Sequence, residues 1–433
     1  MAASTMTIIV LVVALIFYAL EIFPIGVTSV GICVVLALTK TISVTDAFSG
    51  FSSDVVLLVA GMMVVGGAMF QTGVAPAIGR TIVRLAGDKQ LTVMAAILCT
   101  TAGLSAFLSN TACTAMFIPV IAGIAATSAR KFSGKYVYMP LSWAANVGGM
   151  ITLVGSTPQL VAQGVITKAG VAPYSMFEFV PIGLPLTIAT LLYACTIGYK
   201  IAQKIFAKEI EAFMAEEEAA VTTEVVSAQS KAIDSKAWIA GGTMLLMVVL
   251  FVTQPFHKFP VGLLAMLGAF IVVATGCLTE EQAYRSVSWS TICVMAGAMG
   301  LATALEKTGA GKIIADTVLS WLGTAATPFT IFAVMTALAA ALTQVMSCTG
   351  VSAMLTPIAL FMCKSMGIDP HGVIMGVIIG SSIAIMTPIG SAPTAMVLGP
   401  GKYHFMDYVK TGTPITIVLY VLSIILIPMF YPM

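Results

Sequence analysis

Long apolar stretches with almost no charged side chain dominate this sequence and decide what it can fold into. Of its 433 residues, 59% are hydrophobic and 9% are Asp, Glu, Lys or Arg, against about 25% charged residues in an ordinary soluble domain. So few charges cannot cover the surface of a soluble chain of this length, which excludes a soluble globular protein. The formal net charge of +2 gives no reason to expect a nucleic-acid partner. We expect most of the chain to lie in a lipid bilayer.

The apolar stretches predict membrane-spanning helices. About 20 apolar residues cross the hydrocarbon core as a helix, and only helices or closed barrels satisfy their backbone groups there. The period-two alternation of barrel strands is absent, so helices are favoured. The predicted spans are 5–20, 24–39, 54–72, 136–154, 177–199, 237–253, 260–277, 289–306, 370–387 and 411–430. The sequence therefore predicts a multi-pass protein of the cell (inner) membrane.

Two longer apolar regions, 90–128 and 327–366, are interrupted near the middle by small polar triplets. The triplets are Ser109-Asn110-Thr111 and Ser347-Cys348-Thr349. A helix broken at membrane depth is tolerated only where protein buries it or where it lines a cavity. A pair of full crossings would also fit each region, but the apolar neighbours on both sides of each triplet favour re-entrant hairpins.

Motifs recur in the same order in the two halves of the chain. Phe23-Pro24-Ile25-Gly26 returns 236 residues later as Phe259-Pro260-Val261-Gly262, and the triplets correspond at an offset of 238. Collinear matches of this kind predict an internal duplication. Each half then holds five spans and one hairpin, and because five is odd the second copy enters the membrane inverted.

The predicted fold class is therefore all-α, with two inverted repeats. The first repeat covers 1–200 with its hairpin at 90–128, and the second covers 237–433 with its hairpin at 327–366. A charged linker, 201–236, lies between them. We expect this linker to be cytoplasmic, because its side of the membrane collects 14 of the 20 Lys and Arg residues. Inverted repeats with broken helices are typical of secondary transporters that bind substrate near the bilayer midplane.

Polar residues inside the predicted membrane region gather at four places, the two triplets and two helix breaks marked by Gly and Pro. The breaks are Gly155-Ser156-Thr157-Pro158 and Gly390-Ser391-Ala392-Pro393. The carbonyl oxygens of an opened helix can face a cation, and its amides can face an anion. No Asp, Glu, Lys or Arg falls in the middle of any span, which disfavours proton coupling through a carboxylate. We expect an anion held by helix ends, hydroxyls, amides and a co-bound cation, for which sodium is suited.

The sequence carries no signature of an enzyme or an ATPase. It contains no nucleotide-binding loop and no Ser/His/Asp set, its three histidines fall in predicted loops, and its eight cysteines form no C-x-x-C pair. We therefore predict no catalytic residue and no organic cofactor.

These motifs resemble the divalent anion/sodium symporter family, the INDY-type dicarboxylate transporters, over about residues 5–430. The hairpin tips are similar to that family's S-N-T motif, and the two breaks resemble its G-T-P-P-N motif. The resemblance implies a homodimer, in which a transport part of each protomer slides against a scaffold part like an elevator. It also implies co-transported sodium and a small dicarboxylate as partners.

Carried over by position, the resemblance implies two sodium sites and one anion pocket. The first sodium site would use Ser105, Ser109, Asn110 and Gly155. The second would use Thr343, Ser347, Cys348 and Gly390. The anion pocket would be lined by Asn110, Thr111, Ser156, Thr157, Cys348, Thr349, Ser391 and Ala392. The chain departs from the family motifs at Cys348, Gln159 and Thr394, where asparagine is usual.

The leading hypothesis is sodium-coupled, elevator-type symport of a small divalent anion, with a C4-dicarboxylate as the first candidate. The alternatives among carriers are a sodium-independent dicarboxylate exchanger and a carrier of another anion such as sulfate. The alternative from another class is an anion channel, which predicts ion currents that do not saturate.

Overall fold

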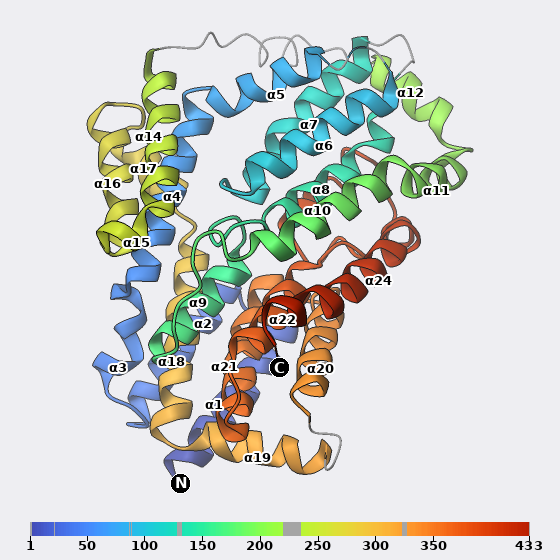
Figure 1. The fold of residues 1–433 in the computed structure, drawn as a ribbon. Coiled ribbons are helices and arrows are strands. Elements are labelled where there is room, and N and C mark those ends of the chain that lie inside the picture. The colour runs from blue at the N-terminus through green and yellow to red at the C-terminus, as the bar shows by residue number, and fades with distance from the viewer. Residues whose placement is uncertain are drawn as a thin grey trace.

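The computed structural model describes residues 2–20, 22–85, 87, 89–127, 132–219, 235–322 and 327–432, and this part of the chain forms helices and loops without a strand (Figure 1). The first-half helices are α1 (Ala3–Leu20), α2 (Ile25–Leu38), α3 (Val44–Phe48), α4 (Asp54–Gln71), α5 (Val74–Leu85), α6 (Gln90–Ser105), α7 (Asn110–Thr127), α8 (Tyr138–Gly148), α9 (Thr157–Lys168), α10 (Val180–Cys195), α11 (Ile197–Phe206) and α12 (Ile210–Ala219).

The described helices of the second half come next in the chain. They are α14 (Ser235–Val252), α15 (Gln254–His257), α16 (Val261–Ala274), α17 (Glu280–Ser286), α18 (Trp289–Lys307), α19 (Ala310–Leu322), α20 (Pro328–Leu342), α21 (Cys348–Met366), α22 (His371–Ser382), α23 (Ala392–Met396) and α24 (Phe405–Phe430). Short 3₁₀ turns at Ser49–Ser52 and Gly134–Tyr136 complete the described elements.

Each of the ten predicted spans contains a helix, but two of these helices are shorter than predicted. α8 ends at Gly148 and α22 at Ser382, and the chain then runs without helix to Ser156 and Ser391. By length and hydropathy, four helices of the described chain qualify as full spans, and the pair α10–α11, bent by 41°, could supply a fifth. Eight further apolar helices have 10–17 residues, so several spans are predicted only when shorter helices are included.

The two regions predicted as hairpins are helix pairs that break at the polar triplets. α6 and α7 are joined by residues 106–109, and α20 and α21 by residues 343–347. α7 therefore begins at Asn110 and α21 at Cys348. This placement puts both triplets at helix N-termini. How deeply the tips enter a membrane stays a prediction.

Two amphipathic helices, α5 and α19, are present where the sequence analysis predicted none. Each follows a Thr-Gly turn in which the glycine has positive φ, +82° at Gly73 and +71° at Gly309. In Figure 1, α5 lies across the top of the molecule and α19 across the bottom. An amphipathic helix that lies along an interface lacks the continuous apolar run on which the span prediction rests.

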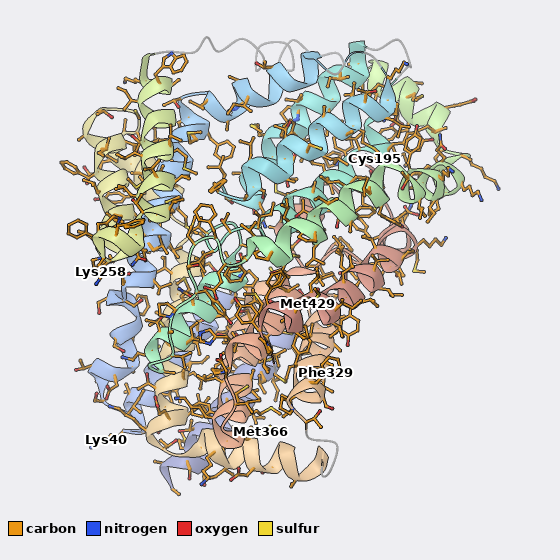
Figure 2. All side chains as sticks on the ribbon, viewed as in Figure 1. Lys40, Cys195, Lys258, Phe329, Met366 and Met429 are labelled. Carbon is orange, nitrogen blue, oxygen red and sulfur yellow. The ribbon has the colours of Figure 1, made fainter. Side chains whose placement is uncertain are left out.

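Helices of the two halves pack against each other throughout the molecule. α4 packs on α16, α2 on α18, and α9 on α21. Large apolar side chains remain exposed on the outside, as at Trp238, Phe270, Phe329 and Met429, the last two labelled in Figure 2. Such an apolar exterior suits contact with lipid.

The linker helix α12 is held against the segment that joins α7 to α8. The Glu217 carboxylate accepts hydrogen bonds from Ser133 Oγ and from the Gly134 amide, each at 3.0 Å. Nearby, Lys135 Nζ lies 3.0 Å from Glu209 Oε2, although the Lys135 side chain is only 2% exposed. Burial raises the pKa of Glu217 to about 7, and the two hydrogen bonds and Lys135 oppose this shift.

The raised pKa of Glu217 predicts a pH-dependent effect of its neutral isostere. Because the folded-state pKa lies above the usual carboxyl value, ionisation at high pH works against docking of α12. We expect Glu217→Gln to raise the apparent unfolding temperature at pH 8.5, where the cost of burying the ionised carboxylate is complete, and to change it little at pH 4, below the usual carboxyl pKa of 4.5, where Glu217 is neutral in both the folded and the unfolded state. Thermal unfolding of the purified protein at the two pH values measures this, and an equal effect at both would contradict it.

Candidate substrate site

Three helices begin at a single cavity of about 560 Å³. α7 and α21 begin at the two hairpin tips and α9 begins after the first break, while the short α23 begins beside them. The N-cap residues of α9 and α21, Ser156 and Ser347, make no capping hydrogen bond with their side chains. The first N–H groups of a helix lack internal partners and carry partial positive charge. This end of the cavity is therefore suited to an anion.

The described lining of the cavity combines apolar side chains with uncharged polar groups. Among the described residues that line it there is no Asp, Glu, Lys, Arg or His. All eight residues predicted for the anion pocket line it, namely Asn110, Thr111, Ser156, Thr157, Cys348, Thr349, Ser391 and Ala392. The structure thus brings the predicted pocket residues together, and their binding roles stay predictions.

The predicted sodium ligands fall into two groups, those that line the cavity and those that are buried beneath the hairpin tips. Ser109, Asn110, Gly155, Ser347, Cys348 and Gly390 line the cavity. Ser105 and Thr343 do not, because they lie fully buried beneath the hairpin tips. Ser105 Oγ donates to the Ala145 carbonyl at 2.8 Å, and Thr343 Oγ1 donates to the Ser381 carbonyl at 2.8 Å.

The side-chain amide of Asn110 sits among oxygen atoms of the first half. Its Oδ1 lies 2.6 Å from Ser105 Oγ. The same terminal atom of the amide lies 3.3 Å from the Ala145 carbonyl oxygen and 2.8 Å from the Gly155 carbonyl oxygen. With Oδ1 turned toward these groups, four oxygens meet, as a hard cation requires. With the amide turned over, Nδ2 donates to all three.

Contacts between the halves close the opposite side of the site. Thr157 Oγ1 and Thr349 Oγ1 lie 2.7 Å apart, so the first break meets the second hairpin tip. Ser352 Oγ donates to the Pro158 carbonyl at 2.8 Å. The site is therefore one structure built from both halves, not two separate sites.

Two buried amides that sequence reasoning missed organise the breaks. Asn146 Nδ2 donates to Ser391 Oγ at 2.8 Å and to the Ala384 carbonyl at 3.0 Å, linking α8 to the second break. Gln344 is the second residue after the end of α20 and is 4% exposed. An amide within an apolar run, as both are, was the available signal, because such groups require partners.

The wall facing the hairpin tips comes from helices outside the predicted site. It includes Met62, Met63 and Phe70 of α4 together with Ser286, Ser288, Ser290 and Thr291 around the start of α18. These hydroxyls belong to span ends, where a polar residue does not stand out in the sequence. Of the two residues at the helix breaks that stand where the resembled family has asparagine, Thr394 donates from its Oγ1 to the Ser391 carbonyl at 2.7 Å. Gln159 is fully buried, and its amide atoms have no hydrogen-bond partner among the described residues.

The close approach of the first break to Asn110 requires glycine at position 149. A Cβ there would lie 2.5 Å from Asn110 Oδ1 and 2.9 Å from the Gly155 carbonyl. We expect Gly149→Ala to cost about 1–3 kcal/mol of stability, as overpacking does. The matched control is Gly103→Ala on α6, where a Cβ meets no atom within 4 Å. Thermal unfolding of both variants measures the difference, and equal unfolding temperatures would contradict the close packing.

Comparison with known proteins places the chain in a family. Its sequence matches the profile of the CitMHS family, described as citrate transporters, over residues 12–354 and 330–432. The chain belongs to the CitMHS family. This CitMHS protein is accordingly a multi-pass membrane secondary transporter and not an enzyme.

Two relatives align with nearly all of the CitMHS chain. It is 23% identical to the uncharacterized transporter YfbS of Escherichia coli (strain K12), with 98% of each chain covered. It is 22% identical to the sodium-dependent dicarboxylate transporter SdcS of Staphylococcus aureus (strain MRSA252), over 95% of this chain and 83% of the relative. The expected resemblance to dicarboxylate symporters therefore holds at the coarser level of a related transporter, and the family shown is CitMHS.

Solved structures show that the fold is that of a helical membrane transporter. The YdaH transporter of Alcanivorax borkumensis has a TM-score of 0.58 at 14% identity, covering 89% of this chain and 86% of that one. MtrF of Neisseria gonorrhoeae, described as one of a class of antimetabolite efflux pumps, has a TM-score of 0.59 at 15% identity, covering 99% and 94%. At these identities the likeness concerns the fold alone.

Proposed function

We propose that this CitMHS protein carries a small dicarboxylate across the membrane together with sodium. One observation supports this most directly: oxygens of Ser105, Ala145 and Gly155 converge on the Asn110 side-chain amide next to the start of α7, at a cavity where α9 and α21 also begin. Helix N-termini stabilise a carboxylate, and the oxygen cluster stabilises a cation beside it. The names of the family and of SdcS, citrate and dicarboxylate carriers, agree with a carboxylate substrate.

The absence of charged groups from the described lining makes coupling to a cation favourable. An anion that leaves water for this cavity loses its hydration, and partial charges at helix ends compensate only in part. A sodium ion at Asn110 would add a full positive charge within a few ångströms. Binding of the cation and of the anion would then strengthen each other, which is the thermodynamic basis of symport.

The Asn110 side-chain amide has two orientations, one suited to the site without an ion and one suited to the site with a bound ion. When Nδ2 faces the Ser105, Ala145 and Gly155 oxygens, the amide supplies donors and the cluster is satisfied without an ion. When Oδ1 faces inward, the cluster becomes a set of cation ligands. In this proposal Ser105, Asn110 and Gly155 hold sodium, with Ser109 at the tip beside them.

The inverted repeat, the elevator motion and the homodimer also remain proposals. The opposite placement of α5 and α19 in Figure 1 supports inversion, because each follows the same Thr-Gly turn in its half. The matching bonds of Ser105 and Thr343 beneath the tips support a duplicated site. The proposed parts are the first repeat 1–200, the linker 201–236 and the second repeat 237–433.

Uptake into liposomes tests the proposed function. We expect purified protein to accumulate labelled succinate when sodium is present outside, and to do so little when choline replaces sodium. Unlabelled citrate and sulfate added in excess show whether a larger carboxylate or an inorganic dianion competes. Exchange of succinate at the same rate without sodium would indicate the exchanger, and unsaturable current would indicate the channel.

Substitutions at the two hairpin tips test the site. We expect Asn110→Ala and Thr349→Ala to lower sodium-driven uptake at least tenfold, because each removes a polar group that lines the cavity. The control is Thr317→Ala, an exposed position on α19 whose hydroxyl bonds only within its own helix. Folding of each variant is checked by its unfolding temperature, and full uptake by both tip variants would overturn the site.

A further inference from the structure

The two hairpins hold their neighbouring helix breaks in different ways. In the first half, Ala106 follows α6, and its carbonyl accepts a hydrogen bond from Thr152 Oγ1. In the second half, Gln344 occupies the matching place, at the same offset of 238 that relates the triplets. Its carbonyl likewise accepts a bond from Thr387 Oγ1, at 2.5 Å. The backbone contact is thus the same in both halves, and only the second half adds a polar side chain.

The Gln344 side chain is fully engaged with the second break and with α20. Its Nε2 donates to the Ile383 carbonyl at 2.7 Å and to the Ala340 carbonyl at 2.8 Å. Its Oε1 accepts from the Met386 amide at 3.0 Å. An N–H group placed between two carbonyl oxygens neutralises them as a small cation would. Ala106 in the first half has no such group, and there only the Asn110 amide at the cavity can donate to the carbonyl oxygens of both Ala145 and Gly155.

The second tip also lacks the side-chain oxygen that the first tip provides. Where Asn110 presents an amide, Cys348 presents a thiol, whose Sγ lies 4.0 Å from Thr349 Oγ1. The Gly390 carbonyl, which matches Gly155, already accepts a hydrogen bond from the Cys348 amide at 3.0 Å. A neutral thiol is a poor ligand for a hard cation, which prefers carbonyl and carboxylate oxygens. The predicted second set therefore offers fewer free oxygens than the first.

We propose that this protein binds one coupling cation per protomer, at the Asn110 oxygen cluster, and that the Gln344 amide permanently takes the place of a second one. Thr343, Ser347, Cys348 and Gly390 then shape the second hairpin tip without holding an ion. This inference rests on the proposed function in naming sodium as the cation. One sodium carried with a dianion leaves one net negative charge on the loaded site.

Equilibrium binding of sodium to the purified protein tests this inference without any transport. Titration with NaCl in choline buffer, followed by calorimetry, is expected to give one site per protomer. The matched variants are Ser105→Ala and Thr343→Ala, which remove hydroxyls that make the same bond in each half. We expect Ser105→Ala to weaken sodium binding at least tenfold and Thr343→Ala to leave it within twofold of the unchanged protein.

Each other outcome overturns the inference. Two sodium ions per protomer, none, or equal loss in the two variants would show that the halves do not differ as proposed. The double variant Cys348→Asn with Gln344→Ala restores the first-half residue types and is expected to bind two sodium ions, and a stoichiometry of one would contradict the role of Gln344. If binding follows the proposal while liposomes show no sodium-driven uptake, the proposed function fails and the single-cation inference stands.

Discussion

The proposed site depends on one physical constraint, which is that its cavity has to favour an anion without a cationic side chain among the described residues that line it. Burying a full charge is costly, so a buried Lys or Arg would need partners of its own. Partial charges at the ends of helices avoid that cost, because the peptide dipoles are already fixed by the helix. The other features of the site follow from the need to end several helices in the middle of the protein and to begin new ones there.

Ending a helix inside the membrane leaves carbonyl and amide groups that must find partners elsewhere. In this protein, buried side chains bridge the ends. Asn146 of α8 bonds to the second break, and Gln344 of the second hairpin bonds to the same break. Ser105 bonds to the Ala145 carbonyl near the end of α8. Glycines then permit the breaks to approach the tips closely, as at Gly149 and Gly390, where a Cβ would overlap neighbouring atoms. Several polar residues in and around the candidate site are therefore also its structural supports.

How much the sequence could predict follows from the same physics. Apolar runs indicated the ten span regions and polar triplets located the helix breaks, because lipid imposes a strong constraint on composition. The breaks after Gly148 and Ser382 are longer than the Gly and Pro residues suggested, since unwinding there is set by the tips they contact. The sequence analysis missed α5 and α19 because a helix that lies along an interface has one polar and one apolar face and therefore lacks a continuous apolar run. Asn146 and Gln344 escaped notice because a single amide within an apolar run gives no indication of its partner.

In the proposed single-cation scheme, the difference between Asn110 and Cys348 gives two similar halves different tasks. Both tips keep a buried hydroxyl bonded to a helix-end carbonyl, so the scaffold beneath each tip is the same. Above that scaffold, one half places the Asn110 amide among three oxygens at the cavity, and the other supplies a buried donor through Gln344. A half that needs an ion to neutralise its carbonyl oxygens responds to the ion gradient, whereas a half that carries its own donor is preorganised at every ion concentration. On this proposal, the dependence of transport on a cation is a property of individual side chains and not of the shared fold.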